Sequence, residues 1–363
     1  MPSSFYLDFM STPEPPETET PPAGVIARLQ QTIVRGPRRT YDSLRRKIKR
    51  LREKAARTAE AARAAINRAR LYPSWMKLGS LNHYAPRPLK PEEFPQIRSW
   101  TGKATQPSIG IVTPSFRQAQ YITATLDSVL DQQYPNLQYR IQDGGSTDGT
   151  VEILQRYAPR LTSWVSEKDG GQADAVTTGL ALMNTDIMAW LNSDDLLMPG
   201  ALNFIGQYFA QNPKVDAIYG HRVLIDEHGQ EIGRWVLPAH RKNVLPWVDY
   251  VPQETLFWRR SLYEKVGGVN RSFQFALDWD LLLRFEKAGA RIVRVPYYIG
   301  CFRIHSAQKT SSQISSVGQQ EMDSIYMREH GRVPHYTEIN RVADAVQYRA
   351  SHATRMLMCG LRR

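Results

Sequence analysis

The feature that most constrains the fold is one pattern repeated along the middle of the chain. Short apolar runs end in small polar residues, and each is followed by a segment with apolar residues at helical spacing. Repeated strand–loop–helix units of this length are typical of α/β folds with parallel strands joined by right-handed crossovers. In open α/β sheets, ligands bind at the carboxyl ends of the strands, so we expect the polar loops to form one site. The apolar runs are residues 109–112, 139–142, 161–165 and 187–191.

The fourth run leads into the most informative loop. It ends abruptly at Asn192-Ser193-Asp194-Asp195, and a Pro199-Gly200 pair then begins another helical pattern. Two carboxylates at the end of a buried strand are hard oxygen ligands, suited to Mg²⁺ or Mn²⁺ on a phosphorylated substrate. The same residues are also ordinary turn and helix-capping chemistry. The loop by itself leaves both interpretations open.

Composition narrows the class of protein. The chain has 363 residues, of which 42% are hydrophobic and 23% charged, enough for a large core or two domains with tails. Two cysteines exclude a disulfide framework and a cysteine-based metal site, and they favour a reducing cytoplasm. The first 22 residues lack the basic and apolar regions of a signal peptide. No apolar run reaches the roughly 18 residues that a membrane span needs, so we expect no membrane-spanning helix, and the cysteine content predicts a cytoplasmic protein.

The positive charge is concentrated in one part of the chain. The formal net charge is +12. Residues 35–70 alone contain 14 Lys and Arg against three acidic residues, a surplus of 11 positive charges. The basicity therefore belongs to one segment and does not indicate a nucleic-acid-binding protein.

Three segments precede the repeated pattern. Residues 1–24 are predicted to be a disordered, acidic, Pro-rich tail, and residues 73–107 a Pro-rich linker. Residues 25–72 form a basic amphipathic segment, with a helix expected over 41–70 because this stretch has no Gly or Pro. Its thin, alanine-rich apolar stripe favours packing on the body of the protein or homo-oligomerisation. Peripheral contact with the inner face of a membrane remains the alternative.

After residue 200 the pattern becomes mixed. A helix is expected after Pro199, a strand at 217–219 and a hairpin of 223–225 with 231–235. A helix is expected over 278–288, followed by a strand at 291–295 and helical structure from residue 316.

The ends of the four predicted strands carry a recognisable combination of motifs. In this order and spacing they resemble the nucleotide-sugar half of family 2 glycosyltransferases, including bacterial polysaccharide glycosyltransferases, and the similarity covers about residues 108–310. The strand-end motifs are Thr113-Pro114-Ser115-Phe116, residues 143–150, residues 166–175 and Asn192-Ser193-Asp194-Asp195. The later motifs are Pro252-Gln253, residues 257–261, Asp278-Trp279-Asp280-Leu281 and Arg303-Ile304-His305.

The resemblance implies a GT-A fold, a Rossmann-like α/β architecture with a mixed, mainly parallel sheet flanked by helices. It divides residues 108–312 into a nucleotide-sugar half, 108–200, and an acceptor half, 201–312, followed by a helical extension over 313–363. It implies a metal-dependent, inverting hexosyl- or N-acetylhexosaminyltransferase that uses a UDP-sugar or another nucleotide sugar. A role in surface polysaccharide, lipopolysaccharide or glycoconjugate synthesis is also family inference, and the acceptor can be a glycan, a lipid-linked molecule or a protein.

The resemblance also implies which residues bind the donor. Asp143 would accept the N–H of uracil, although an Asx turn explains it as well. Asp169 and Gly170 are almost equally well explained as turn residues. The full expected donor set is Thr113, Pro114, Ser115, Phe116, Asp143, Gly144, Asp169, Gly170, Asn192 and Asp194.

The implied metal ligands are Asp195 and His305, with Mn²⁺ or Mg²⁺ as the ion. Asp194 would face the ribose or the metal shell, or cap the helix after Pro199. The alternative for His305 is a structural loop histidine. Neutral imidazole is an acceptable ligand for Mn²⁺.

The implied general base is Asp278. An N-cap aspartate at the start of a helix is the competing explanation. Gln253 and Trp279 are the expected acceptor-site residues, with core packing as the alternative for Trp279. Leu277 stands where many relatives carry Glu, which leaves acceptor binding open.

A second departure from the family pattern is Val176-Thr177, where many relatives have Arg-Asn. Diphosphate contacts would then come from Arg303, Lys309 or Arg259.

Two rival functions remain at this stage. A nucleotidyltransferase of related fold should carry a Gly-rich basic loop after the first strand, but residues 113–118 offer only Arg117 and no glycine. A non-catalytic scaffold that oligomerises through 41–70 would not need the acidic residues and the histidine of the motifs. The sequence does not identify the donor sugar or the acceptor.

Overall fold

The computed structural model describes residues 47, 49–51, 78–94, 106–306, 308 and 314–358. The chain divides into two compact units, residues 11–73 and a larger unit that contains residues 74–363. Of the smaller unit only Lys47 and residues 49–51 are described, and they are helical. The predictions for the tail over 1–24 and for the rest of the basic segment lie outside the described residues.

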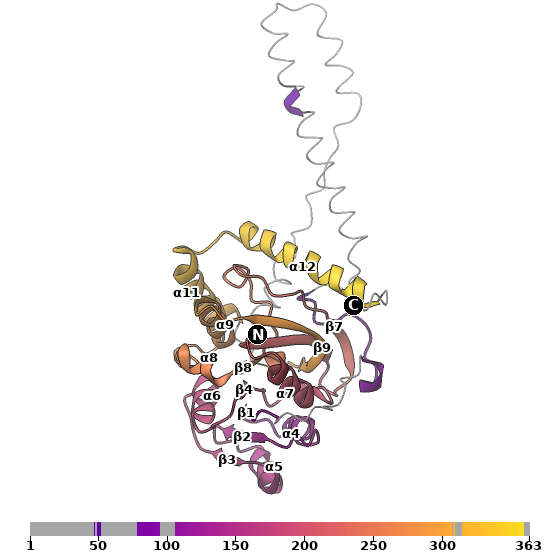
Figure 1. Cartoon of the computed structure of the whole chain (residues 1–363). Helices are drawn as coiled ribbons and strands as arrows, with labels where there is room; N and C mark the ends of the chain where they lie inside the picture. The colour runs from indigo at the N-terminus through magenta and orange to yellow at the C-terminus, as the bar shows by residue number, and fades with distance from the viewer. Residues whose placement is uncertain are drawn as a thin grey trace, which may run out of the picture. The chain divides into compact units, whose positions relative to one another are not determined.

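The larger unit is built on a mixed sheet, shown in Figure 1. Its first four strands are parallel neighbours in the order β3-β2-β1-β4, as the repeated pattern predicted. The strands are β1 (Ile109–Ser115), β2 (Leu137–Asp143), β3 (Ser163–Ser166) and β4 (Ile187–Trp190). The helices between them are α4 (Ile122–Leu130), α5 (Thr150–Tyr157) and α6 (Gln172–Ala181). All seven residues of β1 are buried, as expected for a central parallel strand.

Beyond β4 the sheet contains both directions. β8 (Phe257–Arg259) is antiparallel to β4 and to β6 (Ala217–Ile225), and β9 (Ile292–Arg303) is parallel to β6. β7 (Glu231–Trp235) pairs with β6 as the predicted hairpin. The sequence did not predict the two-residue strand β5 (Leu196–Leu197), which pairs with the end of β9. That pairing brings the acidic loop after β4 beside the end of β9.

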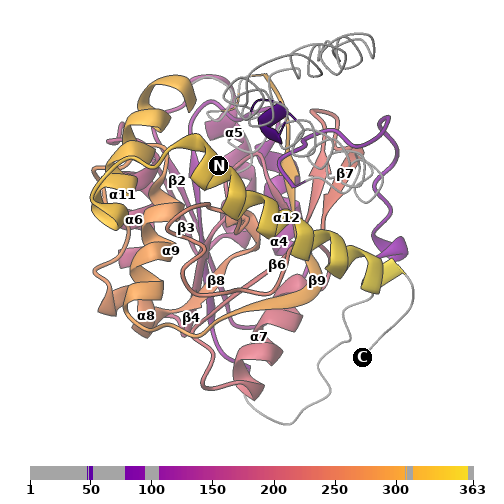
Figure 2. The same cartoon turned by 90° about the horizontal axis from the view of Figure 1, so that it is seen from above.

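The remaining helices cover the sheet. They are α7 (Ala201–Gln211), α8 (Arg260–Lys265), α9 (Leu277–Lys287), α11 (Gln319–His330) and α12 (Tyr336–Met358). Figures 1 and 2 show α9 beside α11, and α12 lying across the part of the sheet that contains β6 and β9. Residues 277–283 of α9 are buried without interruption, so this helix lies inside the core and not on its surface. The predicted helical character of the C-terminal residues agrees with α11, α12 and a short π-helix over Ile314–Gly318.

Part of the predicted linker is integral to the larger unit. Residues 78–94 run along β7, where the His83 N–H donates to the Ile232 carbonyl (2.8 Å) and Arg87 pairs with Glu231. Phe94 is buried against the Tyr298 ring, and this segment ends in a short 3₁₀ helix, η3 (Pro91–Glu93). The segment thus covers an edge strand of the sheet. Among the described helices, none has the length and apolar character needed to cross a bilayer.

Candidate functional site

A cavity of about 740 Å³ opens at the carboxyl ends of β1 to β4. The four polar loops predicted to meet there contribute to one wall, and α9 with the end of β9 forms another. This is the position at which open α/β sheets bind ligands. The predicted residues in the lining are Pro114, Ser115, Phe116, Gly144, Asp169, Asn192, Asp194, Gln253 and Asp278.

The loops after β1, β2 and β3 are in direct contact. A Cβ atom added to Gly144 would lie 3.2 Å from Asp169 Oδ1 and 3.4 Å from the Phe116 ring. A side chain at this position would force Asp169 or Phe116 to shift by a few tenths of an ångström, so glycine favours the close approach of the three loops. Phe116 is 55% exposed beside the cavity and presents an aromatic face that can stack on a flat ligand.

Asp143 lies behind this wall and not in the lining. Its Oδ2 accepts N–H groups from Gly145 (3.2 Å) and Ser146 (2.8 Å) and the hydroxyl of Ser166 (2.6 Å). Its Oδ1 accepts the Ser146 hydroxyl at 2.6 Å. The geometry favours the Asx-turn interpretation, in which Asp143 shapes the loop, and its contact with a nucleobase stays a prediction.

Two further predicted donor residues are not part of the cavity lining. Thr113 is fully buried, with its hydroxyl 2.9 Å from the Tyr139 hydroxyl. The Gly170 N–H donates to Asp174 at 3.1 Å, within its own loop. Asn192 does line the cavity, where its Oδ1 accepts from Gln172 Nε2 at 2.8 Å.

The two aspartates of the acidic loop have different environments. Asp195 is fully buried: its Oδ1 accepts the Arg303 N–H at 3.0 Å and its Oδ2 accepts from Asn192 Nδ2 at 3.3 Å. Asp194 lines the cavity, and its Oδ2 lies 3.0 Å from His305 Nε2. Asp195 as a metal ligand stays a prediction, and the geometry favours Asp194 because only that carboxylate faces both the cavity and His305.

The pair of Asp194 and His305 fits a divalent ion. Asp194 Oδ2 and His305 Nε2 lie at hydrogen-bonding distance, 3.0 Å, and a carboxylate oxygen and an imidazole nitrogen are acceptable ligands for Mn²⁺. Among the described residues, no group of three or more His, Cys, Asp or Glu side chains could hold a metal by itself. An ion would therefore need oxygens from a phosphorylated substrate and water, as Mg²⁺ commonly does.

Asp278 faces the cavity from the second position of α9. Ala276 occupies the N-cap position, so Asp278 is not the cap of this helix. The carboxylate is 4% exposed, and its Oδ1 accepts the Trp279 N–H at 3.0 Å. Burial raises the pKa of Asp278 because the charged form is poorly solvated there. A carboxylate with a raised pKa is a stronger general base than an exposed one.

These features agree with the match to known proteins. The family model described as Glycosyl transferase family 2 matches residues 110–304. The chain belongs to glycosyltransferase family 2. An uncharacterized glycosyltransferase of Mycobacterium tuberculosis is 29% identical over 199 residues, which is 54% of this chain and 73% of the relative. Chondroitin synthase of Escherichia coli is 29% identical over 187 residues, or 50% of this chain but only 27% of that larger protein.

Solved structures show that the fold is shared. S. aureus TarS 1–349 in complex with UDP-GlcNAc has a TM-score of 0.50 and 14% identity, and covers 67% of this chain and 72% of its own. A mannosyltransferase from Pyrobaculum calidifontis in complex with GDP-Man and Mn²⁺ has a TM-score of 0.50 and 18% identity. The match covers 85% of this chain and 89% of the mannosyltransferase. The predicted GT-A fold, with a curled, mainly parallel sheet flanked by helices, is confirmed.

The basic residues of this glycosyltransferase differ from those expected to contact a diphosphate. Arg303 Nε donates to the Asp194 carbonyl at 2.8 Å, and Arg259 donates to backbone carbonyls near the end of α7. Both guanidinium groups therefore hold the backbone, and Lys309 lies outside the described residues. Among the described lining residues, Lys168 alone has a cationic side chain. The sequence placed Lys168 within a strand-end motif but gave no signal that it faces the cavity.

The loop before α9 is fixed by a residue that the sequence analysis did not identify. Glu321 of α11 accepts the backbone N–H groups of Gln274 (2.6 Å), Phe275 (2.8 Å) and Ala276 (2.8 Å). This carboxylate at the amino end of α9 takes the place of a local capping residue. Its distance along the chain from α9 explains why no local pattern identified it.

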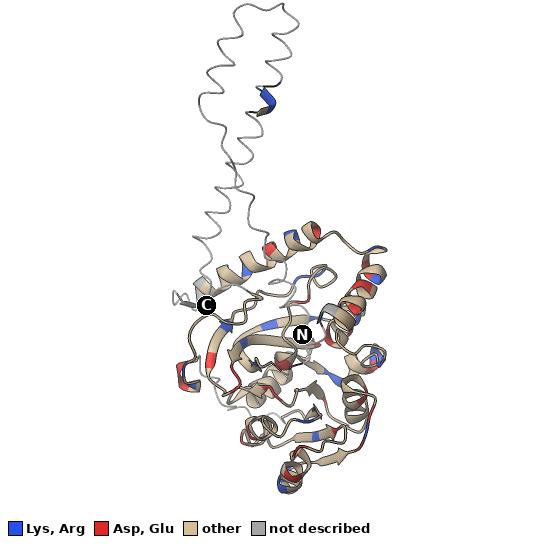
Figure 3. Ribbon diagram, turned by 180° about the vertical axis from the view of Figure 1, so that it is seen from behind, with Lys and Arg blue, Asp and Glu red and all other residues tan. Residues whose placement is uncertain are grey.

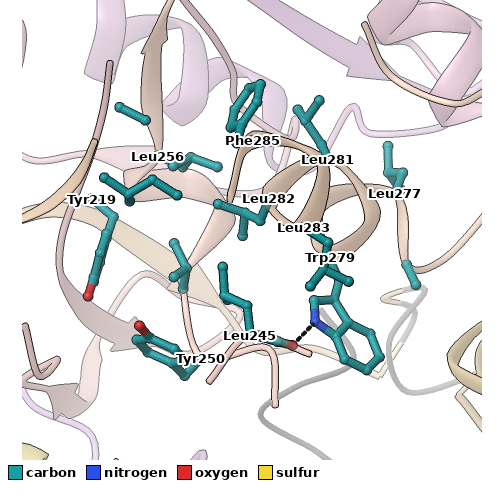
Figure 4. Packing of buried hydrophobic residues seen from close by; sticks show 14 of the residues in the cluster. Tyr219, Leu245, Tyr250, Leu256, Leu277, Trp279, Leu281, Leu282, Leu283 and Phe285 are labelled. Atoms are coloured by element: carbon teal, nitrogen blue, oxygen red, sulfur yellow. Dashed lines mark hydrogen bonds between the residues drawn. The ribbon is translucent and has the colours of Figure 1, made fainter. Parts of the chain in front are cut away.

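Of the two residues predicted to bind the acceptor, one lies in the core and the other lines the cavity. Trp279 is buried in the core, where its Nε1 donates to the Leu245 carbonyl at 2.7 Å, as Figure 4 shows. Its ring also contacts the ring of Tyr326. The core-packing alternative is favoured for Trp279. Gln253 lines the cavity and donates from Nε2 to the Trp190 carbonyl at 2.7 Å.

A buried ion pair lies under the enzyme's site. The Arg222 guanidinium binds the Glu254 carboxylate at 2.7 and 2.6 Å, with both side chains at most 1% exposed. Rings of Trp235 and Phe302 lie 4.9 and 4.5 Å from the guanidinium carbon. Such a pair orders the surrounding chain, and loss of one partner leaves an uncompensated charge. On the outside of the protein, Figure 3 shows both signs of charge along α11 and α12.

Proposed function

We propose that this enzyme transfers a sugar from a nucleoside diphosphate sugar to an acceptor hydroxyl, with a divalent ion bound and with inversion at the anomeric carbon. The observation that carries the proposal is that one cavity contains both Asp194, in contact with His305, and Asp278. Asp194 and His305 together suit the binding of a metal-bound diphosphate, and the buried carboxylate of Asp278 suits the activation of an acceptor hydroxyl.

The proposed donor is a UDP-sugar. The lining around the loop after β1 offers Phe116 for stacking, and Ser115 Oγ and Gln118 Oε1 have no hydrogen-bond partner among the described residues. Such groups can bind the polar edges of a base and ribose. Among the similar structures, TarS was solved with UDP-GlcNAc and the Pyrobaculum mannosyltransferase with GDP-Man, so GDP-sugars belong in the test panel.

In the proposed complex, Asp194 and His305 would hold Mn²⁺ or Mg²⁺ next to the diphosphate. A bound divalent ion neutralises the charge that develops on the leaving diphosphate. Lys168 adds a positive charge at the same cavity. The residues of the chain thereby hold the leaving group on one side of the sugar.

Asp278 is the proposed general base on the other side. It removes the proton of the acceptor hydroxyl while that oxygen bonds to the anomeric carbon and the bond to the diphosphate oxygen breaks. One direct displacement of this kind inverts the anomeric centre and needs no covalent glycosyl-enzyme.

The test is the variant Asp278→Asn. It should abolish transfer but keep the wild-type affinity for the donor, measured by calorimetry with UDP-GlcNAc, UDP-glucose, UDP-galactose and GDP-mannose. Glu264→Gln makes the same acid-to-amide change on the exposed surface of α8 and should keep full activity. Substantial turnover by Asp278→Asn would refute the base assignment. Equal donor affinity with Mn²⁺ and with EDTA would refute the metal assignment.

The biological role is proposed from relatives alone. Similar proteins include the E. coli chondroitin synthase and a mycobacterial PGL/p-HBAD biosynthesis glycosyltransferase. We therefore propose a role in the synthesis of a surface polysaccharide or glycoconjugate. Cytoplasmic location, oligomerisation and membrane contact through the basic helix stay predictions.

A further inference from the structure

We propose that Trp190 and Gln253 form a donor–acceptor pair that binds one hydroxyl group of the transferred sugar and so contributes to donor-sugar selection. This inference rests on the proposed function, because it assumes a nucleotide-sugar donor in the cavity.

The two residues lie on neighbouring elements beneath the acidic loop. Trp190 is the last residue of β4, two residues before Asn192, and Gln253 begins the 3₁₀ helix η5 (Gln253–Thr255) that leads into β8. β8 pairs with β4, so the two side chains come from adjacent parts of the sheet. Each residue is only 2% exposed, yet both line the cavity together with Asp194 and Asp278.

The orientation of the Gln253 amide follows from its partner. Nε2 donates to the Trp190 carbonyl at 2.7 Å, and a carbonyl can only accept, so the amide cannot be turned around without losing this bond. Gln253 Oε1 therefore faces elsewhere, and among the described residues it has no hydrogen-bond partner. Trp190 Nε1 is likewise without a partner there.

One donor and one acceptor match a hydroxyl group. A hydroxyl accepts an N–H bond on its oxygen and donates its own proton, so it can satisfy Trp190 Nε1–H and Gln253 Oε1 together. Buried polar groups that lack partners are unfavourable, and such groups are rare in folded proteins. Both residues belong to the cavity lining, so we infer that a sugar hydroxyl entering between them satisfies the two atoms.

A second buried tryptophan, Trp258, shows that an indole N–H without a partner is not by itself evidence of a ligand. Trp258 packs edge to face against Trp190 with ring centroids 5.6 Å apart, and its Nε1 also lacks a partner among the described residues. Trp258 is fully buried and is not part of the cavity lining. The proposal therefore depends on the combination with Gln253 and on the position in the cavity, and Trp258 supplies a matched control.

The position favours the sugar over the nucleoside. The nucleoside loops follow β1, β2 and β3, whereas η5 contacts β9 and β5, which lie under the acidic loop. In the proposed complex the sugar must lie between the diphosphate at Asp194 and the base Asp278. Trp190 is four residues before Asp194, and Trp190 and Gln253 share the cavity lining with Asp194 and Asp278.

The experiment compares affinities for donors and for free nucleotides. Trp190→Phe keeps an aromatic ring and removes the N–H. It should weaken binding of the preferred donor among UDP-GlcNAc, UDP-glucose, UDP-galactose and GDP-mannose by about tenfold, equivalent to about 1.4 kcal/mol. Binding of UDP or GDP should stay at the wild-type value. Gln253→Met should show the same selective loss, and Trp258→Phe should change neither affinity.

Three results would overturn this inference. If Trp190→Phe binds the donor as tightly as wild type, or loses donor and free nucleotide equally, the inference is overturned. If the wild-type protein binds no nucleotide or nucleotide sugar, the proposed function falls and this inference with it.

Donor analogues that lack one sugar hydroxyl at a time provide the same test on the unaltered wild-type protein. One analogue should lose at least tenfold more affinity than the others. Equal small losses for every analogue would overturn the proposal even if Trp190→Phe failed to fold.

Discussion

The acidic loop allows one experiment that separates catalysis from folding. Asp194→Ala and Asp195→Ala remove the same chemical group from adjacent residues. The structure predicts opposite outcomes, because Asp194 faces the cavity and His305 whereas Asp195 is fully buried and bonded to the backbone. The sequence-based assignment of Asp195 as the metal ligand predicts that Asp195→Ala loses metal binding.

The expected loss of stability follows from the hydrogen bonds. Asp195→Ala leaves the buried Arg303 N–H without an acceptor, which costs about 1–3 kcal/mol. Burial raises the pKa of Asp195, so removal of a poorly solvated carboxylate offsets part of this cost. We expect a net loss of about 2 kcal/mol, or a melting temperature lower by about 4–8 °C for a domain of this size. Asp194 is partly exposed, so water can take the place of its carboxylate beside His305, and Asp194→Ala should cost less than Asp195→Ala.

For metal binding we expect the opposite order, with a larger loss for Asp194→Ala than for Asp195→Ala. Loss of residues that only orient metal ligands typically costs about 10–100-fold in affinity, so loss of the ligand itself should cost at least as much. Calorimetry with UDP and Mn²⁺ should show this loss for Asp194→Ala. Asp195→Ala, measured below its melting temperature, should lose less affinity than Asp194→Ala, because Asp195 only orients the loop that carries Asp194. Normal metal-dependent binding by Asp194→Ala, together with its loss in a stably folded Asp195→Ala, would refute the reasoning.

Three further predictions concern charges around the site. Because burial raises the pKa of Asp278 and the base acts only when ionised, kcat/KM should fall with decreasing pH above the value of about 4 expected for an exposed aspartate. A pH–rate profile that stays flat down to pH 4 would contradict this. Arg222→Met leaves Glu254 as an uncompensated buried charge and should cost about 3–5 kcal/mol in urea unfolding, with a large part recovered in the double variant that adds Glu254→Gln. A single-variant loss below about 1 kcal/mol would contradict the buried-pair account. Lys168→Met should weaken UDP binding several-fold at low salt and less at high salt, because exposed charges are screened, and it should leave uridine binding unchanged. Equal losses for UDP and uridine would show that Lys168 does not act on the diphosphate.

The sequence by itself determined the local elements and the side of the sheet on which the site lies. Alternating apolar runs, Gly-rich loops and helical spacing are properties of neighbouring residues, so β1 to β4 and the hairpin of β6 with β7 agreed with prediction. Because parallel strands end at one edge, the convergence of the four loops followed from the same pattern. The family motifs then predicted Asp278, Asp194 and His305 as site residues, and the fold places Asp278 and Asp194 in one cavity lining, with His305 against Asp194.

Tertiary structure alone decided which side chains face the cavity. A change of one position turns a side chain from solvent to core, so the sequence could not separate Asp194 from Asp195, or recognise Trp279 as a core residue. The two-residue strand β5 directly follows the acidic loop and pairs with the end of β9, which places Asp195 against the Arg303 backbone.

The groups that support the site come from far along the chain. Glu321 is 45 residues from Ala276, and Arg222 is 32 residues from Glu254. Pairing at such separations depends on how whole elements pack, and no local pattern of residues contains that information.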